Sequence, residues 1–205
     1  MNSTSQHNTV TAYLALGANL GDAQQAVHQA MRDIAQLPDT RLLACSSLYR
    51  TAPVESSGPD YINAVVQIET ALQPLALLHA IHALEQAAGR ERPWRNAPRT
   101  LDIDILLYGD LLLNTPELTI PHPRMGQRAF VLVPLAEIAP EKVDARQLQA
   151  VANQAIQAIE RLQADGAAAA ATPITPATAV QPGTQSTAQP TTHPAAQSAA
   201  PGSGA

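Results

Sequence analysis

An apolar segment that carries two acidic residues constrains this chain more than any other feature. Residues 101–107 are apolar except for Asp102 and Asp104, and they have the length and branched side chains of a buried β-strand. Because side chains alternate along a strand, both carboxylates project from one face, roughly 6.5 Å apart at the backbone. Two neighbouring anions in an apolar strand are costly unless a cation or basic groups lie between them. Their oxygens predict a Mg²⁺ site that phosphate oxygens complete.

Arginines gather on both sides of this predicted strand. The chain has eleven Arg and one Lys, although its net charge is −5. Guanidinium groups bind phosphate through paired hydrogen bonds, so arginines beside a carboxylate pair favour a phosphate-binding site. The alternative is an edge strand whose acids pair with a solvated basic loop. The arginines are Arg90, Arg92, Arg95, Arg99, Arg124 and Arg128.

The spacing of apolar residues predicts one α+β domain over residues 10–163. Two helices are expected, one capped by Asp22 and one that begins at Pro74. With the strands, their order matches the ferredoxin-like split βαβ fold, an antiparallel sheet with helices packed on one face. The expected strands cover residues 10–16, 41–50, 61–69 and 101–107.

Three further segments complete the predicted domain. Residues 17–21 read as a tight turn with two glycines, for which a simple strand-to-helix connection is favoured over a phosphate loop. A helix is expected within 124–138. A last helix is expected after Asp144, with Leu148, Val151, Ala155, Ile159 and Leu162 on one side.

Both ends of the chain are predicted to be disordered. Residues 1–9 are polar and show no apolar periodicity. Residues 164–205 consist mainly of Ala, Pro, Thr, Gln, Ser and Gly, with no aromatic or basic residue except a single His. Such a segment cannot bury enough apolar surface to offset its loss of conformational entropy on ordering.

Several polar residues could line a ligand site, and each has an alternative reading. Tyr61 and Asn63 share one strand face, which suits a planar heterocycle and equally suits an exposed cross-strand pair. His82 and Glu85 lie three apart on a helix flank, where a solvated surface is the more common fate. His122 lies between two prolines that restrict its backbone, which indicates a positioned side chain.

Missing motifs exclude several classes of protein. No Gly-x-x-x-x-Gly-Lys-Ser/Thr, Gly-x-Gly-x-x-Gly, Gly-x-Ser-x-Gly or zinc-ligand spacing occurs. The polar start shows no secretion signal, and no apolar run is long enough to span a bilayer. Without a basic stripe, nucleic acid is not an expected partner. The lone Cys45 fits a reducing compartment, so a cytoplasmic protein is expected.

Six motifs in order resemble the 6-hydroxymethyl-7,8-dihydropterin pyrophosphokinases of folate biosynthesis. Among them, Arg99-Thr-Leu-Asp-Ile-Asp104 followed by Pro121-His-Pro-Arg124 is a specific combination. The likeness covers residues 10 to about 140. The six matching segments are Tyr13 to Gly21, Ser47 to Val54, Pro59 to Val65, Gly89 to Arg92, Arg95 to Asp104, and Pro121 to Arg124 continued by Arg128 to Phe130.

The resemblance implies transfer of the β,γ-pyrophosphoryl unit of ATP to the pterin hydroxymethyl group, leaving AMP. Asp102 and Asp104 would hold two Mg²⁺ ions and, with Arg90 and Arg99, act on the reacting phosphates. The residues implied at ATP are His82, Glu85, Arg90, Arg92, Arg95, Arg99, Ile105, Thr119, His122 and Arg128. Those implied at the pterin are Thr51, Ala52, Pro53, Val54, Tyr61, Asn63, Asn96, Asp102 and Phe130.

The chain departs from the family pattern at two places. Many members carry a Trp directly before a Gly-Pro-Arg segment, whereas this chain has Asn96 there and Trp94 two residues earlier. Pro123 stands where some members have Tyr. Two rival functions share parts of the same pattern: a metal-dependent phosphohydrolase, which would release phosphate without a pterin, and a non-catalytic ligand-binding module, which would bind without Mg²⁺.

Overall fold

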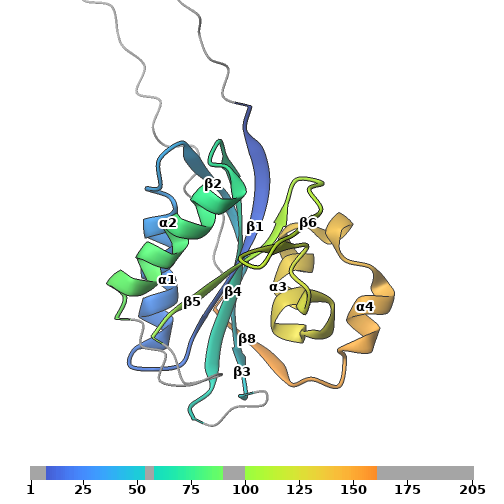
Figure 1. Cartoon of the computed structure of the whole chain (residues 1–205). Helices are drawn as coiled ribbons and strands as arrows, with labels where there is room; N and C mark the ends of the chain where they lie inside the picture. Colours follow the sequence, from blue (N-terminus) through green and yellow to red (C-terminus); the bar gives the residue numbers. More distant parts are fainter. Residues whose placement is uncertain (1–7, 54–57, 90–99, 161–205) are drawn as a thin grey trace, which may run out of the picture. The chain divides into compact units, whose positions relative to one another are not determined.

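The computed structural model of the chain describes residues 8–53, 58–89 and 100–160 (Figure 1). All of these residues belong to one structural unit, Met1–Ala170. The predicted disorder of residues 1–9 and 164–205 concerns segments that lie almost entirely outside the described residues. None of the helices in the described ranges is long and apolar enough to cross a membrane.

A six-stranded antiparallel sheet forms the centre of this unit, and its strand order is that of the predicted ferredoxin-like fold. Along the sheet the order is β5-β1-β4-β3-β8, and β2 pairs with another part of β4. A separate pair, β6 and β7, follows β5. The strands are β1 (Val10–Ala18), β2 (Thr40–Cys45), β3 (Leu48–Thr51), β4 (Tyr61–Thr70), β5 (Asp102–Tyr108), β6 (Leu113–Asn114), β7 (Thr119–Ile120) and β8 (Ile156–Glu160).

Two helices, α1 (Ala23–Ile34) and α2 (Pro74–Ala87), cover one face of the sheet, called here the α1/α2 face (Figure 1). The Asp22 carboxylate accepts a hydrogen bond from the Gln25 backbone N–H at 2.9 Å, which caps α1 as predicted. Pro74 occupies the first turn of α2, and Gly89 follows its end with a φ of +78°. The apolar sides of both helices pack on alternate residues of β1, β4 and β5.

Two more helices, α3 (Ala129–Ile138) and α4 (Ala145–Ala150), lie on the opposite face, called here the α3 face (Figure 1). The two helices of the split βαβ unit therefore share one face, as expected, and the later helices α3 and α4 cover the other. The strand residues that alternate with those facing α1 and α2 form a second buried cluster with α3. This cluster includes Tyr13, Val65 and Leu106. Because the sheet carries apolar side chains on both faces, each face requires a cover.

The predicted strand over 41–50 is divided in two. Its ladder breaks at Ser46, whose backbone N–H donates to the Val65 carbonyl and whose hydroxyl accepts from the Val65 N–H, both at 2.9 Å. The side-chain oxygen thus replaces a backbone acceptor. The strand that begins at Val10 instead runs longer than expected, through Gly17 to Ala18, so the predicted turn begins two residues later.

The predicted C-terminal helix is mostly wrong. Asp144 does cap a helix, with a complete capping box to Gln147, but α4 ends at Ala150. Residues 156–160 form β8, which pairs with the free edge of β3. The helix expected within 124–138 is also shorter, because a 3₁₀ turn (Met125–Gln127) precedes α3.

Candidate active site

Asp102 and Asp104 lie on the α3 face of β5, the edge strand that pairs with β1. Asp102 is opposite Gly17 and Asp104 is opposite Ala15. Their neighbours Ile103 and Ile105 are buried in the core on the α1/α2 face, so both acids project to the other side, as the alternation predicts. Both residues are half-buried, which leaves their carboxylates within reach of solvent and ligands.

His122 lies beside this pair. Its Nε2 is 3.9 Å from Oδ2 of Asp104, too long for a hydrogen bond, and the ring is 16% exposed against 41% for the acid. Burial lowers the pKa of His122, against the opposing effect of Asp104. The Arg124 backbone N–H donates to Nδ1 at 3.3 Å, so the neutral ring carries its hydrogen on Nε2, toward the carboxylate. His122 thus presents Nε2, and not Nδ1, to Asp104.

Glu85 supports the carboxylate strand from behind. It is 1% exposed, and its Oε1 accepts a hydrogen bond from the Ile103 backbone N–H at 2.8 Å. Ile103 lies between the two acids, so Glu85 fixes the backbone that carries both. The solvated surface favoured for this helix flank therefore holds for His82, which is exposed, and not for Glu85.

Asn63 and Tyr61 lie on the same α3 face, at the start of β4. Asn63 is opposite Gly17 on one side and Tyr49 on the other. Its amide nitrogen donates to Oγ1 of Thr51 at 2.9 Å, and both residues are buried. One row across the sheet therefore runs Asp102, Gly17, Asn63, Tyr49.

Phe130 reaches this face from α3, where it packs at the margin of the second core cluster. The Arg128 guanidinium lies over the ring, 5.2 Å from its centroid, in cation–π geometry. Both residues are half-buried. An aromatic surface and a cation are therefore held together on the helix that covers the α3 face.

The remaining residues implied by the resemblance have different placements. Ile105 is buried in the core on the α1/α2 face, so its side chain is not available to a ligand on the α3 face. Thr119 is half-buried on β7, where its hydroxyl donates to the Asn114 side chain at 3.3 Å. Ala52 is exposed and Pro53 is half-buried at the end of β3. Outside the described residues lie Val54, Arg90, Arg92, Arg95, Asn96, Arg99 and also Trp94.

Two residues that organise this region were not predicted from the sequence. Asn19 is buried just after β1, and its side chain donates a hydrogen bond to the Pro59 carbonyl at 3.2 Å. This bond connects the end of β1 to the residues that precede β4. Glu137 on α3 accepts from the Ser47 N–H, the Ser47 hydroxyl and the Tyr49 hydroxyl at 2.7–2.9 Å. For Asn19, the sequence signal is a polar amide within a predicted turn. For Glu137, the local sequence gives no signal.

The oxygen-only, half-buried donor set of Asp102 and Asp104 suits Mg²⁺, which takes one or two protein carboxylates and completes its shell with water and phosphate. Across the described ranges no group of three or more His, Cys, Asp and Glu side chains could hold a metal ion. The pair therefore fits a cation that arrives with a phosphate ligand better than a closed protein cage.

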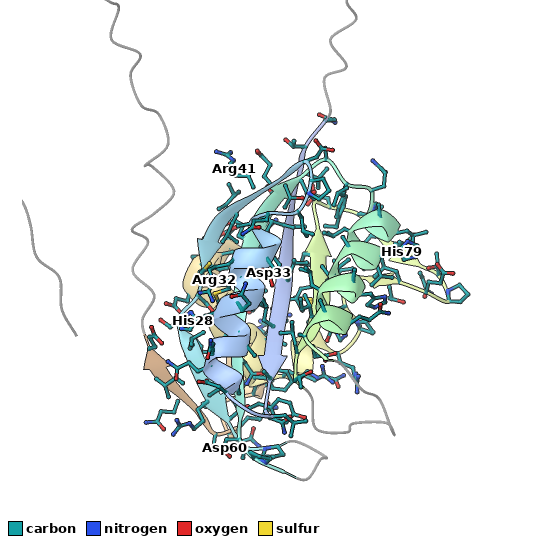
Figure 2. The ribbon with its side chains drawn as sticks, turned by 90° about the vertical axis from the view of Figure 1, so that its left-hand side faces the viewer. His28, Arg32, Asp33, Arg41, Asp60 and His79 are labelled. Carbon is teal, nitrogen blue, oxygen red and sulfur yellow. The ribbon has the colours of Figure 1, made fainter. Side chains whose placement is uncertain are left out.

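On the other side of the sheet, charged groups lie on the two helices, and His28 of α1 contacts Glu160 of β8 at 3.2 Å. Figure 2 views the α1/α2 side and shows His28, Arg32 and Asp33 on α1 and His79 on α2 at the outer surface. Asp60 marks the end of the sheet at which β4 begins. The row Asp102, Gly17, Asn63, Tyr49 lies on the opposite side, the α3 face.

Comparison with known proteins agrees with these features. Residues 13–140 match the family model of 7,8-dihydro-6-hydroxymethylpterin-pyrophosphokinase (HPPK). The chain is 47% identical over 135 residues to the 2-amino-4-hydroxy-6-hydroxymethyldihydropteridine pyrophosphokinase of Haemophilus influenzae, covering 65% of this chain and 84% of that protein. It is 46% identical over 130 residues to the Pseudomonas aeruginosa protein of the same name, covering 63% and 80%.

Solved structures support the fold. A crystal structure of wild-type Plasmodium falciparum HPPK-DHPS with pteroate superposes with a TM-score of 0.53 at 15% identity. The match covers 65% of this chain and 39% of that one, so this chain spans about two fifths of the longer protein. With the sequence matches, the chain belongs to the 7,8-dihydro-6-hydroxymethylpterin-pyrophosphokinase family of diphosphotransferase enzymes.

Proposed function

We propose that this enzyme transfers pyrophosphate from ATP to the hydroxymethyl group of 6-hydroxymethyl-7,8-dihydropterin, as a step of tetrahydrofolate biosynthesis. The products are AMP and the pterin diphosphate. In this reaction the hydroxymethyl oxygen bonds to the β-phosphorus of ATP while the bond between that phosphorus and the α,β-bridging oxygen breaks. The bridging oxygen leaves with AMP, and the hydroxyl proton passes to solvent.

One observation supports this proposal: in the row Asp102, Gly17, Asn63, a carboxylate and a hydrogen-bonded amide lie on one face, two strands apart. With strand spacings of 4.7–4.9 Å, their backbones lie roughly 10 Å apart. That separation suits a ligand with a planar ring at one end and a phosphate-accepting hydroxyl at the other.

At the phosphate end, Asp102 and Asp104 would hold two Mg²⁺ ions. When bound, Mg²⁺ supplies charge neutralisation on the phosphate oxygens. The guanidinium groups of Arg90, Arg92, Arg95 and Arg99 would add hydrogen bonds to the same oxygens. His122, neutral and with its hydrogen on Nε2, would donate without adding charge.

At the ring end, the Asn63 amide would read the hydrogen-bonding edge of the pterin, because Thr51 already fixes its orientation. The Phe130 ring would stack on the pterin, and the Tyr61 ring would border the same pocket. Holding ring and phosphate in one orientation makes the transfer effectively unimolecular, which is the main contribution that a protein makes to phosphoryl chemistry. The single cysteine, which forms no disulfide, is compatible with work in a reducing cytosol.

The test is to incubate the purified chain with ATP, Mg²⁺ and the reduced pterin, and to follow AMP and inorganic phosphate by phosphorus NMR. We expect AMP to form only when all three are present, in equal amount to the pterin diphosphate. Release of phosphate without pterin would instead identify a phosphohydrolase. Pterin binding without any AMP would identify a binding module.

A further inference from the structure

Gly17 occupies the middle position of the row that joins the two ends of the proposed site. It lies within β1, with Asp102 of β5 on one side and Asn63 of β4 on the other. A glycine inside a central strand weakens the strand, and such a residue often marks a place where a ligand approaches the backbone closely. Because Gly17 lies inside a strand, a turn does not explain why this position is a glycine.

The backbone of Gly17 does not itself require glycine. Among the described glycines, the positive φ values that disfavour other residues occur at Gly21, Gly58, Gly89 and Gly109, and not at Gly17. An added Cβ would be 3.2 Å from Oδ1 of Asn63, and no other heavy atom of the described residues beyond its chain neighbours lies within 4 Å of it. The space above Gly17 is therefore open within the part of the chain that the structure describes.

The one neighbour of that space is held in place. Asn63 is 4% exposed, and its amide nitrogen donates to Oγ1 of Thr51, which is also buried. Its carbonyl oxygen is the atom next to Gly17, so it presents an acceptor at the edge of the open space. A methyl group at position 17 would require this oxygen to shift by a few tenths of an ångström and would stand where a flat ligand would lie.

We propose that Gly17 is a specificity-determining residue: its missing side chain leaves a flat floor on which the pterin ring lies between the Asn63 amide and the Asp102 carboxylate. This inference rests on the proposed function. It adds that one face of the pterin ring contacts the backbone of β1 at Gly17. Any side chain at position 17 lifts or tilts the ring, which separates the hydroxymethyl group from the phosphate end. The nucleotide, bound at the carboxylates and arginines, does not use this floor.

The experiment compares the wild type, Gly17→Ala and Gly126→Ala; Gly126 lies in the 3₁₀ turn before α3, away from the Gly17 row, and an added Cβ there would make only an ordinary 3.7 Å contact with Gln147. Binding of the reduced pterin and of a non-hydrolysable ATP analogue with Mg²⁺ is measured by calorimetry, and the melting temperature by scanning calorimetry. We expect Gly17→Ala to weaken pterin binding by about tenfold or more, since a misplaced methyl group in a fitted pocket has an effect of this size. Nucleotide binding and melting temperature should match those of Gly126→Ala.

Equal pterin affinity in the two variants would overturn the inference, and so would equal loss of pterin and nucleotide binding in Gly17→Ala. If the wild-type chain does not bind the pterin at all, the proposed function fails first, and that result is distinguishable. Should Gly17→Ala fold poorly, Asn63→Ser combined with Gly17→Ala removes the close contact. That pair is compared with Asn63→Ser alone, and the same tenfold loss is expected.

Discussion

The two faces of the sheet differ in what their side chains do. On the α1/α2 face, alternate residues of β1, β4 and β5 are almost all aliphatic and fully buried under two helices. On the α3 face a smaller apolar cluster lies beside half-buried carboxylates, an oriented amide and an uncovered glycine. The same three strands therefore carry the larger core on one face and the candidate active site on the other, since side chains alternate.

This separation predicts that changes on one face affect stability and changes on the other affect turnover. The sharpest case is the carboxylate pair. Asp102→Asn and Asp104→Asn should each lower kcat by at least about 10²–10³-fold, because preorganised charge at the reacting phosphates is lost. The melting temperature should stay the same or rise, since repulsion between the two acids is relieved.

The matched control is Asp110→Asn, an exposed acid in the turn after β5. It should leave both turnover and melting temperature unchanged. A near-normal rate in either Asp102→Asn or Asp104→Asn would contradict the proposed metal-binding role.

The opposite pattern is expected in the core. Leu14 is fully buried on the α1/α2 face, so Leu14→Ala should lower the free energy of unfolding by about 2–5 kcal/mol through lost burial and the cavity left behind. The folded fraction should keep the pterin KM of the wild type. Denaturant unfolding measures the free energy of unfolding, and steady-state kinetics measure the pterin KM. The control is Leu112→Ala, at a residue that is 81% exposed, which should change neither.

Glu85 links the two faces, and its variants should show both effects. Glu85→Ala leaves the Ile103 N–H buried without its acceptor, at a cost of about 1–3 kcal/mol, and frees the backbone between the two acids. The Mg²⁺ concentration that gives half-maximal turnover should rise. Glu85→Gln keeps an acceptor oxygen and should recover most of both losses; no difference between the two variants would show that this hydrogen bond does not position β5.

The smallest effect is expected where α3 is attached to β3. Glu137→Ala removes one carboxylate that accepts three hydrogen bonds from Ser47 and Tyr49, but the residue is exposed and water can replace it. A loss of about 1 kcal/mol in the free energy of unfolding is expected. Glu117→Ala, also exposed, should show none, and an equal loss in both would contradict a role for Glu137 in attaching α3 to β3.

Local sequence was sufficient for the parts of the fold that local physics determines. Two-residue alternation predicts which side chains share a face, and the structure confirms it over 61–69 and 101–106; an irregularity in the β1–β5 register puts Leu107 on the same face as Leu106. Asp22 and Pro74 predict helix starts for two reasons. The Asp22 carboxylate accepts a hydrogen bond from an unpaired N–H of the first turn, and Pro74 has no N–H that would remain unpaired there.

Pairings between distant segments could not be predicted in this way. The apolar spacing of 148–162 fits a helix, yet 156–160 becomes a strand because β3 offers it a free edge more than a hundred residues away. The Thr51–Asn63 hydrogen bond likewise depends on the register of β3 and β4, and Glu85 is buried only because β5 packs against α2.

The position of β5 at the border of the sheet has a consequence for any preparation of this enzyme. β5 is an edge strand rich in Ile and Leu, and the edge strand of another molecule can pair with such a strand. Charged side chains on an edge strand oppose this pairing. Asp102 and Asp104 are the charges of this strand. Neutralising them should therefore make the protein associate at high concentration, which light scattering would detect, so the acids proposed to act in phosphate transfer would also oppose association.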